Sequence, residues 1–150
     1  MRIGIDARMM GHGYGIGRYI TELVTSLVEQ SSSDTFVIFV RDAKTLTDCL
    51  PLSVIERCRI VFADIAWYSV KEQIRFAGIV SKEHCDLVHF PHWNVPMLYR
   101  KPYVVTIHDL TMFHHKRSEA TTRSPLVYFV KDRIHRWLIS FVAFRAKQII

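Results

Sequence analysis

Two apolar runs of this sequence end in residues that can exchange protons or bind hydroxyl groups near neutral pH. The run DLVHF is followed by His92 and Asn94, and the run YVVTI is followed by His108 and Asp109. Ligands gather at the carboxyl ends of strands in parallel sheets, so we expect these side chains to face one rim. His89 lies inside its apolar run and is interpreted as a hydrogen-bonded core histidine.

The spacing of these histidines argues against a metal site. Zinc needs three or four ligands in tetrahedral geometry, and the HFPH segment has a proline between its histidines, unlike the helical HExxH arrangement. The three cysteines form no CxxC pair, which predicts neither a cysteine zinc site nor a disulfide framework. We therefore expect reduced thiols, no bound metal and no cofactor.

A second chemical feature is the segment GHGYGIGRYI, residues 11–20, which has a glycine at every second position up to Gly17. It follows the first apolar run and opens the first helical pattern, where unpaired backbone N–H groups and the helix dipole favour an anion. Its spacing matches neither GxGxxG nor GxxxxGK[ST], so neither a dinucleotide site nor a P-loop ATP site is predicted. Two interpretations stay open, a phosphate-contacting loop and a plain flexible turn.

The elements that must position these residues alternate along the chain. Five β-rich runs predict strands: RIGIDA, TFVIFV, RIVFA, DLVHF and YVVTI. Helical apolar stripes run from Ile16 to Leu27, through Val70, Ile74 and Ala77, and through Val130, Ile134, Trp137 and Phe141, the last opened by Pro125. The pattern predicts one α/β domain over residues 1–150, a Rossmann-like, mostly parallel sheet with helices on both faces.

The basic charge is unevenly distributed along the chain. Of a net charge of +6, residues 1–98 carry ten Lys/Arg against eleven Asp/Glu, and residues 99–150 carry ten against three. A basic face suits nucleic acid, anionic lipid or a phosphorylated substrate. The sequence contains no nucleic-acid module with interleaved aromatic residues, so we expect no nucleic-acid partner. It also has no secretory signal and no apolar run of membrane-spanning length, which favours a cytoplasmic location.

Two long segments together resemble the N-terminal domain of family 4 glycosyltransferases of the GT-B fold, particularly the mannosyltransferase-like members. In GIDARMMGHGYGIGRYITELVTSL, a GIDAR strand is followed by a glycine loop and GIGRY. In KEQIRFAGIVSKEHCDLVHFPHWNVPMLYRKPYVVTIHDLTMFHH, Glu-Gln on a helix precedes a His-x-Pro-His strand end and a Thr-x-His-Asp-Leu strand end. The resemblance covers most of the chain and is weak between residues 31 and 65.

The resemblance implies a retaining transferase that moves a sugar, with mannose as a candidate, from a nucleotide-sugar to a glycan or lipid-linked acceptor. It implies that Gly13, Gly15 and Gly17 leave room for donor phosphates or the transferred sugar. His108 would hydrogen-bond the reacting sugar and is the candidate catalytic residue. The other residues assigned to the donor or acceptor site are Arg18, His92, Asn94 and Asp109. The resemblance also implies that no bound metal is needed and that the leaving phosphate is the base, which agrees with the lack of a catalytic carboxylate pair.

The family's second α/β domain, which binds the nucleotide, has no counterpart in this sequence. We therefore expect an incomplete first domain, a fragment, a truncated gene or half of a split enzyme, that is inactive without that domain in cis or in trans. The final RAKQII predicts the start of a further strand. The alternative function is a non-catalytic assembly module or a subunit peripherally bound to the inner membrane face through the basic, Trp137-containing last helix. That helix can also be interpreted as a core helix whose basic side chains lie at the edges of its apolar face, and we favour this interpretation.

Overall fold

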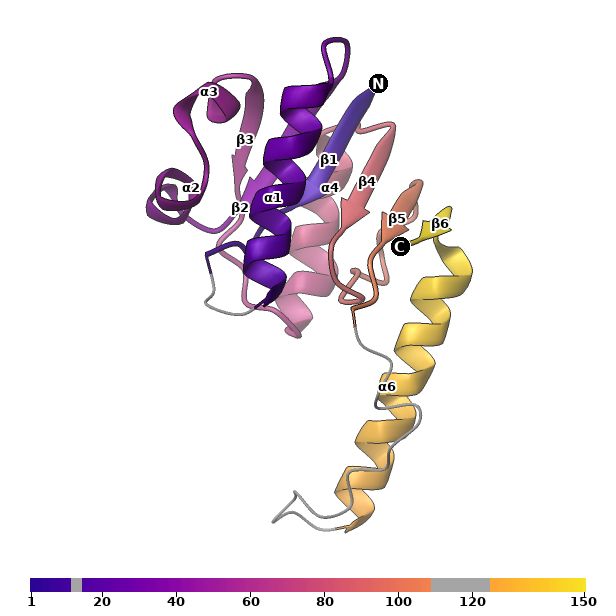
Figure 1. Cartoon of the computed structure of the whole chain (residues 1–150). Coiled ribbons are helices and arrows are strands. Elements are labelled where there is room, and N and C mark those ends of the chain that lie inside the picture. The colour runs from indigo at the N-terminus through magenta and orange to yellow at the C-terminus, as the bar shows by residue number, and fades with distance from the viewer. Residues whose placement is uncertain (12–14, 109–124) are drawn as a thin grey trace.

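The structure, a computed structural model, describes residues 1–11, 15–108 and 125–150, so Gly13 and Asp109 lie outside the described residues. Six parallel strands form one sheet in the order β3-β2-β1-β4-β5-β6 (Figure 1). The strands are β1 (Arg2–Asp6), β2 (Thr35–Val40), β3 (Cys58–Phe62), β4 (Leu87–Phe90), β5 (Tyr103–Val105) and β6 (Gln148–Ile149). The strand order reverses between β1 and β4, where ligands bind in folds of this kind.

Helices cover both faces of the sheet, as predicted. They are α1 (Gly15–Gln30), α2 (Ala43–Cys49), α3 (Leu52–Ile55), the π-helical turn η1 (Glu72–Phe76), α4 (Ala77–Lys82) and α6 (Pro125–Arg145). Helices α1, α2 and α3 pack on one face, and η1, α4 and the last turns of α6 pack on the other (Figure 1). The α/β, Rossmann-like fold class is confirmed. The short helices α2 and α3 were not predicted.

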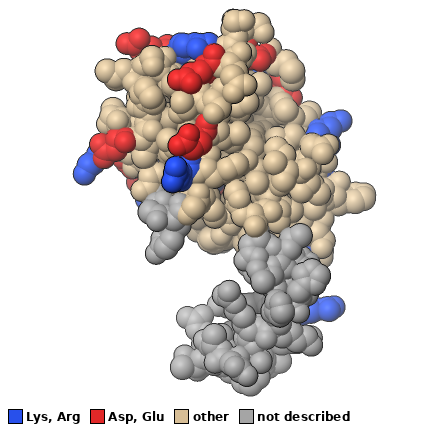
Figure 2. All heavy atoms as spheres, viewed as in Figure 1, with Lys and Arg blue, Asp and Glu red and all other residues tan. Residues whose placement is uncertain are grey.

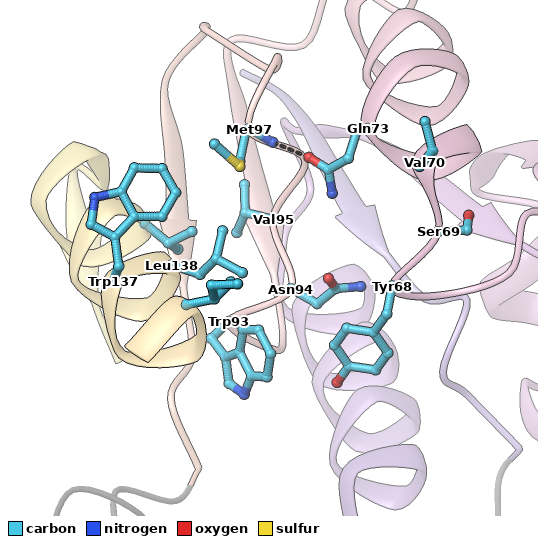
Figure 3. Close-up of a pocket in the computed structure, with 12 residues that line it drawn as sticks. Tyr68, Ser69, Val70, Gln73, Trp93, Asn94, Val95, Met97, Trp137 and Leu138 are labelled. Atoms are coloured by element: carbon cyan, nitrogen blue, oxygen red, sulfur yellow. Dashed lines mark hydrogen bonds between the residues drawn. The ribbon is translucent and has the colours of Figure 1, made fainter. Parts of the chain in front are cut away.

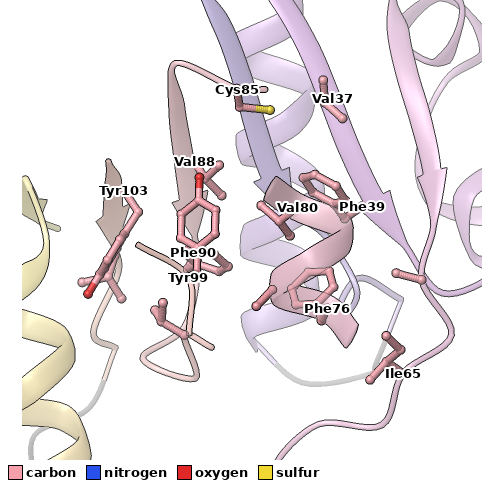
Figure 4. Close-up of a cluster of buried hydrophobic side chains, with 14 of the residues drawn as sticks. Val37, Phe39, Ile65, Phe76, Val80, Cys85, Val88, Phe90, Tyr99 and Tyr103 are labelled. Atoms are coloured by element: carbon pink, nitrogen blue, oxygen red, sulfur yellow. The ribbon is translucent and has the colours of Figure 1, made fainter. Parts of the chain in front are cut away.

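Alternation along the central strands divides the core into two layers. Val37 and Phe39 of β2 point to the α4 face, whereas Ile38 points to the α1 face. Figure 4 shows the cluster on the α4 face, in which Phe39 packs edge-to-face against Phe76 with ring centroids 5.8 Å apart. These buried layers hold the strand ends, and therefore the candidate site, in fixed positions.

The apolar stripe predicted through Val70, Ile74 and Ala77 is wrong for its first two members. Val70 is 77% exposed and Ile74 is 61% exposed, while Phe76 and the carboxylate residue Glu72 are fully buried. The π-helical turn η1 adds a residue to the turn, so the side chains leave the 3.6-residue period on which the prediction depended.

The stripe predicted on the last helix also differs from its buried face. Ile134 is 52% exposed and Trp137 is 55% exposed, whereas Ile139 and Val142 are buried. Figure 1 gives the reason, because α6 extends well beyond the short edge strands β5 and β6 and only its last turns cover the sheet. Among the described side chains of α6, the core-helix interpretation therefore holds for the last turns, which carry Ile139 and Val142. The further strand predicted in RAKQII is confirmed as β6.

On the face shown in Figure 2, the described surface has no continuous patch of side chains of one charge. Acidic and basic side chains are interspersed along its upper and left margins, and few charges lie over its lower centre. Within the described ranges, no helix combines the length and the apolar character that crossing a membrane requires.

Candidate functional site

Helix α1 begins beside the carboxyl end of β5, and Tyr19 joins the two. The Tyr19 hydroxyl lies 3.1 Å from Thr106 Oγ1, and the Tyr19 ring meets the His108 ring edge-on with centroids 4.8 Å apart. Gly17 and Arg18 stand in the same helical turn as Tyr19. The structure therefore brings the glycine-rich start of α1 and His108 to one rim of the sheet.

The ring of His108 is held in one orientation. Its Nε2 lies 2.8 Å from the Pro91 carbonyl oxygen, and because a carbonyl only accepts, Nε2 carries the proton. The side chain is exposed, and no described residue forms a hydrogen bond with Nδ1. His108 therefore presents Nδ1 to a ligand, where it can hydrogen-bond a hydroxyl group or, as imidazolium, stabilise negative charge.

His89 is a core histidine, as predicted. It is 5% exposed, and its Nε2 lies 2.8 Å from Thr106 Oγ1. Burial, and secondarily the nearby His108, lowers the pKa of His89 to about 4. The ring is therefore neutral at neutral pH, and its hydrogen bond to Thr106 extends the contact that Tyr19 makes with the same hydroxyl.

The glycines of residues 11–20 differ in what their backbone requires. Gly15 opens α1, and a Cβ built on it would have no heavy atom of the described residues within 4 Å. Positive φ is found at Gly11, with φ 77°, and not at Gly15. Gly17 is buried in α1, and Arg18 is exposed. The first four N–H groups of a helix have no partner within the helix, and no described residue crowds the side-chain position at Gly15.

A buried ion network lies beneath this rim. Arg8 Nη2 donates to Asp6 Oδ2 at 2.8 Å and to Glu72 Oε1 at 2.6 Å, and Arg8 Nε donates to Asp6 Oδ1 at 2.8 Å. Arg8 is 1% exposed, Glu72 is fully buried, and the guanidinium carbon lies 3.5 Å from the Phe76 ring centroid. Burial lowers the pKa of Arg8, but Asp6 and Glu72 outweigh it, so the pKa lies above its ordinary value and the guanidinium stays charged.

The same network positions two loops. Asn94 Nδ2 donates to Glu72 Oε1 at 2.8 Å, and the Tyr68 backbone N–H donates to Glu72 Oε2 at 2.7 Å. Tyr68 has φ 58°, which is strained for an aromatic residue and persists only where its surroundings impose it. Glu72 therefore fixes the segment before η1 and the segment after β4 relative to each other.

These two loops present a group of aromatic rings. The Tyr68 and Trp93 rings are tilted by 41° with centroids 5.5 Å apart, and His92 lies 4.9 Å from Trp93. His92 Nδ1 accepts the Asn94 backbone N–H at 3.2 Å. The predicted residues His92 and Asn94 thus belong to this aromatic group, which continues from the Pro91 carbonyl that orients His108.

Beside the aromatic group is a cavity of about 340 Å³ between these loops and α6 (Figure 3). Its described lining residues are mostly apolar, and none of them is charged. The lining residues are Tyr68, Ser69, Val70, Gln73, Trp93, Asn94, Val95, Met97, Ile134, Trp137, Leu138 and Val142. Trp93 and Tyr68 lie on the side of the loops, and Trp137 and Leu138 come from α6 (Figure 3).

Sequence reasoning missed Asp6, Arg8, Glu72 and Tyr68 as parts of the site. One signal was present, because the first apolar run ends in two opposite charges two residues apart, as if a buried ion pair followed the strand. Their partner Glu72 is distant in sequence, and no residue pattern around it predicts that it is buried in an ion pair. Within the described ranges, no group of three or more His, Cys, Asp or Glu side chains is placed to hold a metal ion.

Comparison with known proteins gives no further information on the site, because no family model, curated protein or solved structure matches this chain.

Proposed function

We propose that this chain is the acceptor-side domain of a retaining glycosyltransferase of the family 4 type. It would transfer a hexosyl group, with mannose as the leading candidate, from a nucleotide-sugar to a glycan or lipid-linked acceptor. One observation carries the proposal, the meeting of the glycine-rich start of α1 with His108 at the carboxyl ends of the strands through Tyr19. The residue pattern that resembles the family, described above, supplies the reaction class.

Each group at the rim has a role that its geometry supports. The free N–H groups of the first turn of α1 would face donor phosphate oxygens, because Gly15 leaves the approach open. The exposed Arg18 adds a positive charge one turn into the helix. His108 Nδ1 would hydrogen-bond the transferred sugar, more strongly as charge develops in the transition state.

Among the described residues, Asp6 and Glu72 lie beneath the rim, and both are held by the buried guanidinium of Arg8. The resemblance to the family implies a mechanism in which the departing phosphate is the base, and these two paired carboxylates are compatible with it. The bond from the anomeric carbon to the phosphate oxygen breaks, the acceptor oxygen bonds to that carbon, and the acceptor proton goes to the phosphate. A second α/β domain, in cis or in trans, would hold the nucleotide.

The experiment titrates the ¹⁵N-labelled chain with mannose 1-phosphate and follows backbone amide shifts. We expect saturable shifts at residues 15–19 and at His108, and weaker shifts with inorganic phosphate. The Gly15→Val variant should bind at least about tenfold more weakly, because its side chain fills the approach to the N–H groups.

Gly78→Val is the matched control. Gly78 also lies in a helix with no heavy atom of the described residues within 4 Å of a built Cβ, so it takes the same substitution at an uncrowded helical position away from the rim. Equal affinity of Gly15→Val and Gly78→Val for mannose 1-phosphate, with both folded, would refute the phosphate role of the glycine segment. Equal shifts with inorganic phosphate would reduce the site to a general anion site.

A second candidate, a surface that docks on an anionic membrane, is favoured by the exposed apolar side chains of α6. Ile134 is 52% exposed, Trp137 is 55% exposed and Phe144 is 90% exposed. Exposed Arg133 adds positive charge to the same helix. Sedimentation with vesicles containing anionic lipid tests this function. Binding that is lost in Trp137→Gln would support it, and no binding at low salt would exclude it.

A further inference from the structure

We propose that the cavity beside α6 binds an uncharged glycoside, with the sugar ring on Trp93 and Tyr68 and an apolar aglycone against α6. In the transferase proposed above, this ligand would be the acceptor. The inference rests on that function only for the choice of a sugar as the polar part of the ligand.

Two amide side chains give the cavity one donor and one acceptor of known identity. Gln73 Oε1 accepts the Met97 backbone N–H at 2.8 Å, so Gln73 Nε2 remains as a donor (Figure 3). Asn94 Nδ2 donates to the Glu72 carboxylate, so Asn94 Oδ1 remains as an acceptor. Because a backbone N–H only donates and a carboxylate only accepts, neither amide can be flipped. No described residue satisfies either remaining group.

A sugar hydroxyl matches this pair, because it donates and accepts at once. The aromatic rings beside the pair match the rest of a pyranose, whose faces carry C–H groups. The Tyr68 and Trp93 rings are tilted toward each other at 5.5 Å, and the Tyr68 side chain is 60% exposed to solvent. Exposed aromatic surface beside unsatisfied amides indicates a site for a ligand that is apolar on one side and hydroxylated on its rim.

The opposite wall of the cavity is apolar. Ile134, Trp137 and Leu138 of α6 line it. Figure 3 shows Trp137 and Leu138 on this side of the cavity, and Trp137 also stacks on Phe141 with centroids 5.4 Å apart. A polar wall facing an apolar wall suits a ligand with a sugar at one end and a hydrocarbon or aryl group at the other. The volume of about 340 Å³ lies at the lower end of the range for small-molecule sites, about 300–1,000 Å³.

The described lining favours an uncharged ligand at this position. None of the described lining residues carries a formal charge, and the charged Glu72 and Arg8 beneath them are already paired with each other. A phosphorylated donor therefore has its partners at the start of α1, and the uncharged acceptor has its partners in the cavity. The strained Tyr68, held by Glu72, pre-forms the aromatic wall and lowers the ordering cost of binding.

The tryptophan indole N–H signals provide a test with an internal control. Trp93 and Trp137 line the cavity, whereas Trp67 does not. We expect phenyl α-D-mannopyranoside to shift the indole signals of Trp93 and Trp137 saturably and to leave that of Trp67 in place. Its affinity should exceed that of free mannose or benzyl alcohol by at least about tenfold, since it reaches both walls.

Gln73→Glu tests the donor without disturbing the loop. The carboxylate still accepts the Met97 N–H but presents an acceptor, and a charge, to the ligand. We expect affinity for the glycoside to fall by at least about tenfold. Gln30→Glu, on the exposed end of α1, is the charge-matched control and should not change it. Trp137→Leu should weaken phenyl mannoside more than free mannose.

Three results would overturn the proposal: benzyl alcohol binding as tightly as the glycoside with no loss in Gln73→Glu, shifts at Trp67 as large as those at Trp93, or no saturable shift. If Gln73→Glu lowers the melting temperature, the indole shifts of the unmodified chain still decide. The mannose 1-phosphate titration keeps the two proposals apart. If mannose 1-phosphate binds at the rim but the glycoside does not bind in the cavity, the transferase proposal holds and the cavity proposal fails. If the glycoside binds in the cavity but mannose 1-phosphate does not bind at the rim, the chain is a sugar-binding domain.

Discussion

His89 should make the folded protein sensitive to mild acid. Its pKa is lowered to about 4 in the folded protein, against an ordinary value of 6.5. The unfolded chain therefore takes up a proton as the pH falls through 6.5, whereas the folded chain does so only near 4. The stability from burying the neutral ring is complete above pH 6.5 and is lost progressively as the pH falls to 4.

The size of this loss follows from the same two values. The difference of 2.5 pKa units between 6.5 and about 4 corresponds to about 3 kcal/mol, at about 1.4 kcal/mol per unit. In His89→Gln, an amide replaces the ring beside Thr106 and cannot titrate in this range. The variant should be less stable than the parent at neutral pH, but the gap should narrow by about 3 kcal/mol toward pH 4.

The assay is urea unfolding of both proteins at several values between about pH 7.5 and pH 4. Contributions from carboxylates are common to the two proteins and cancel in the difference. His84→Gln is the control, because it removes an exposed histidine outside the buried core. A parallel decline of the parent and His89→Gln over this range would show that His89 is not held neutral by burial.

The remaining predictions concern the buried network, the rim and metal. Glu72→Gln puts an amide donor against either the Arg8 guanidinium or a backbone N–H, so it should lower the free energy of unfolding by about 3–5 kcal/mol. Exposed Glu29→Gln should change it by less than about 0.5 kcal/mol, and equal melting temperatures would refute the network's role. In a preparation that transfers sugar, His108→Ala should lower kcat about a hundredfold with a smaller change in KM, and full activity in folded protein would remove His108 from the site. Elemental analysis of dialysed protein should find no stoichiometric zinc, and one bound equivalent would revive a histidine metal site.

The fold could be predicted where the pattern depends on neighbouring residues. Buried parallel strands appear as continuous apolar runs, so TFVIFV was recognisable as β2 with no knowledge of its partners. Pro125 marked the start of α6 because proline fits a first helical turn. The strand expected in RAKQII is also present, as β6. These features are local, and local signals survive in a single sequence.

The candidate site depended on contacts that a sequence does not carry. Arg8 and Glu72 are 64 positions apart, and only the folded chain shows that each neutralises the other. The π-helical turn at Glu72 shifted the exposed face of its segment, and the period of the sequence gave the wrong stripe. Tyr68 has no feature that predicts its positive φ, which arises because Glu72 binds its N–H. The cavity depends on contacts between residues far apart in sequence, whereas the local residue pattern predicts only the strand ends around it.

The glycines of residues 11–20 are under different structural constraints, although they belong to one motif. Gly11 needs positive φ, and a Cβ there would lie 2.8 Å from Thr45 Cγ2, so the fold itself requires that glycine. Gly15 has neither constraint, since its φ is not positive and its surroundings are open. Among the described residues, nothing in the fold requires glycine at position 15, so Gly15→Val tests the proposed phosphate role at little expected cost to folding.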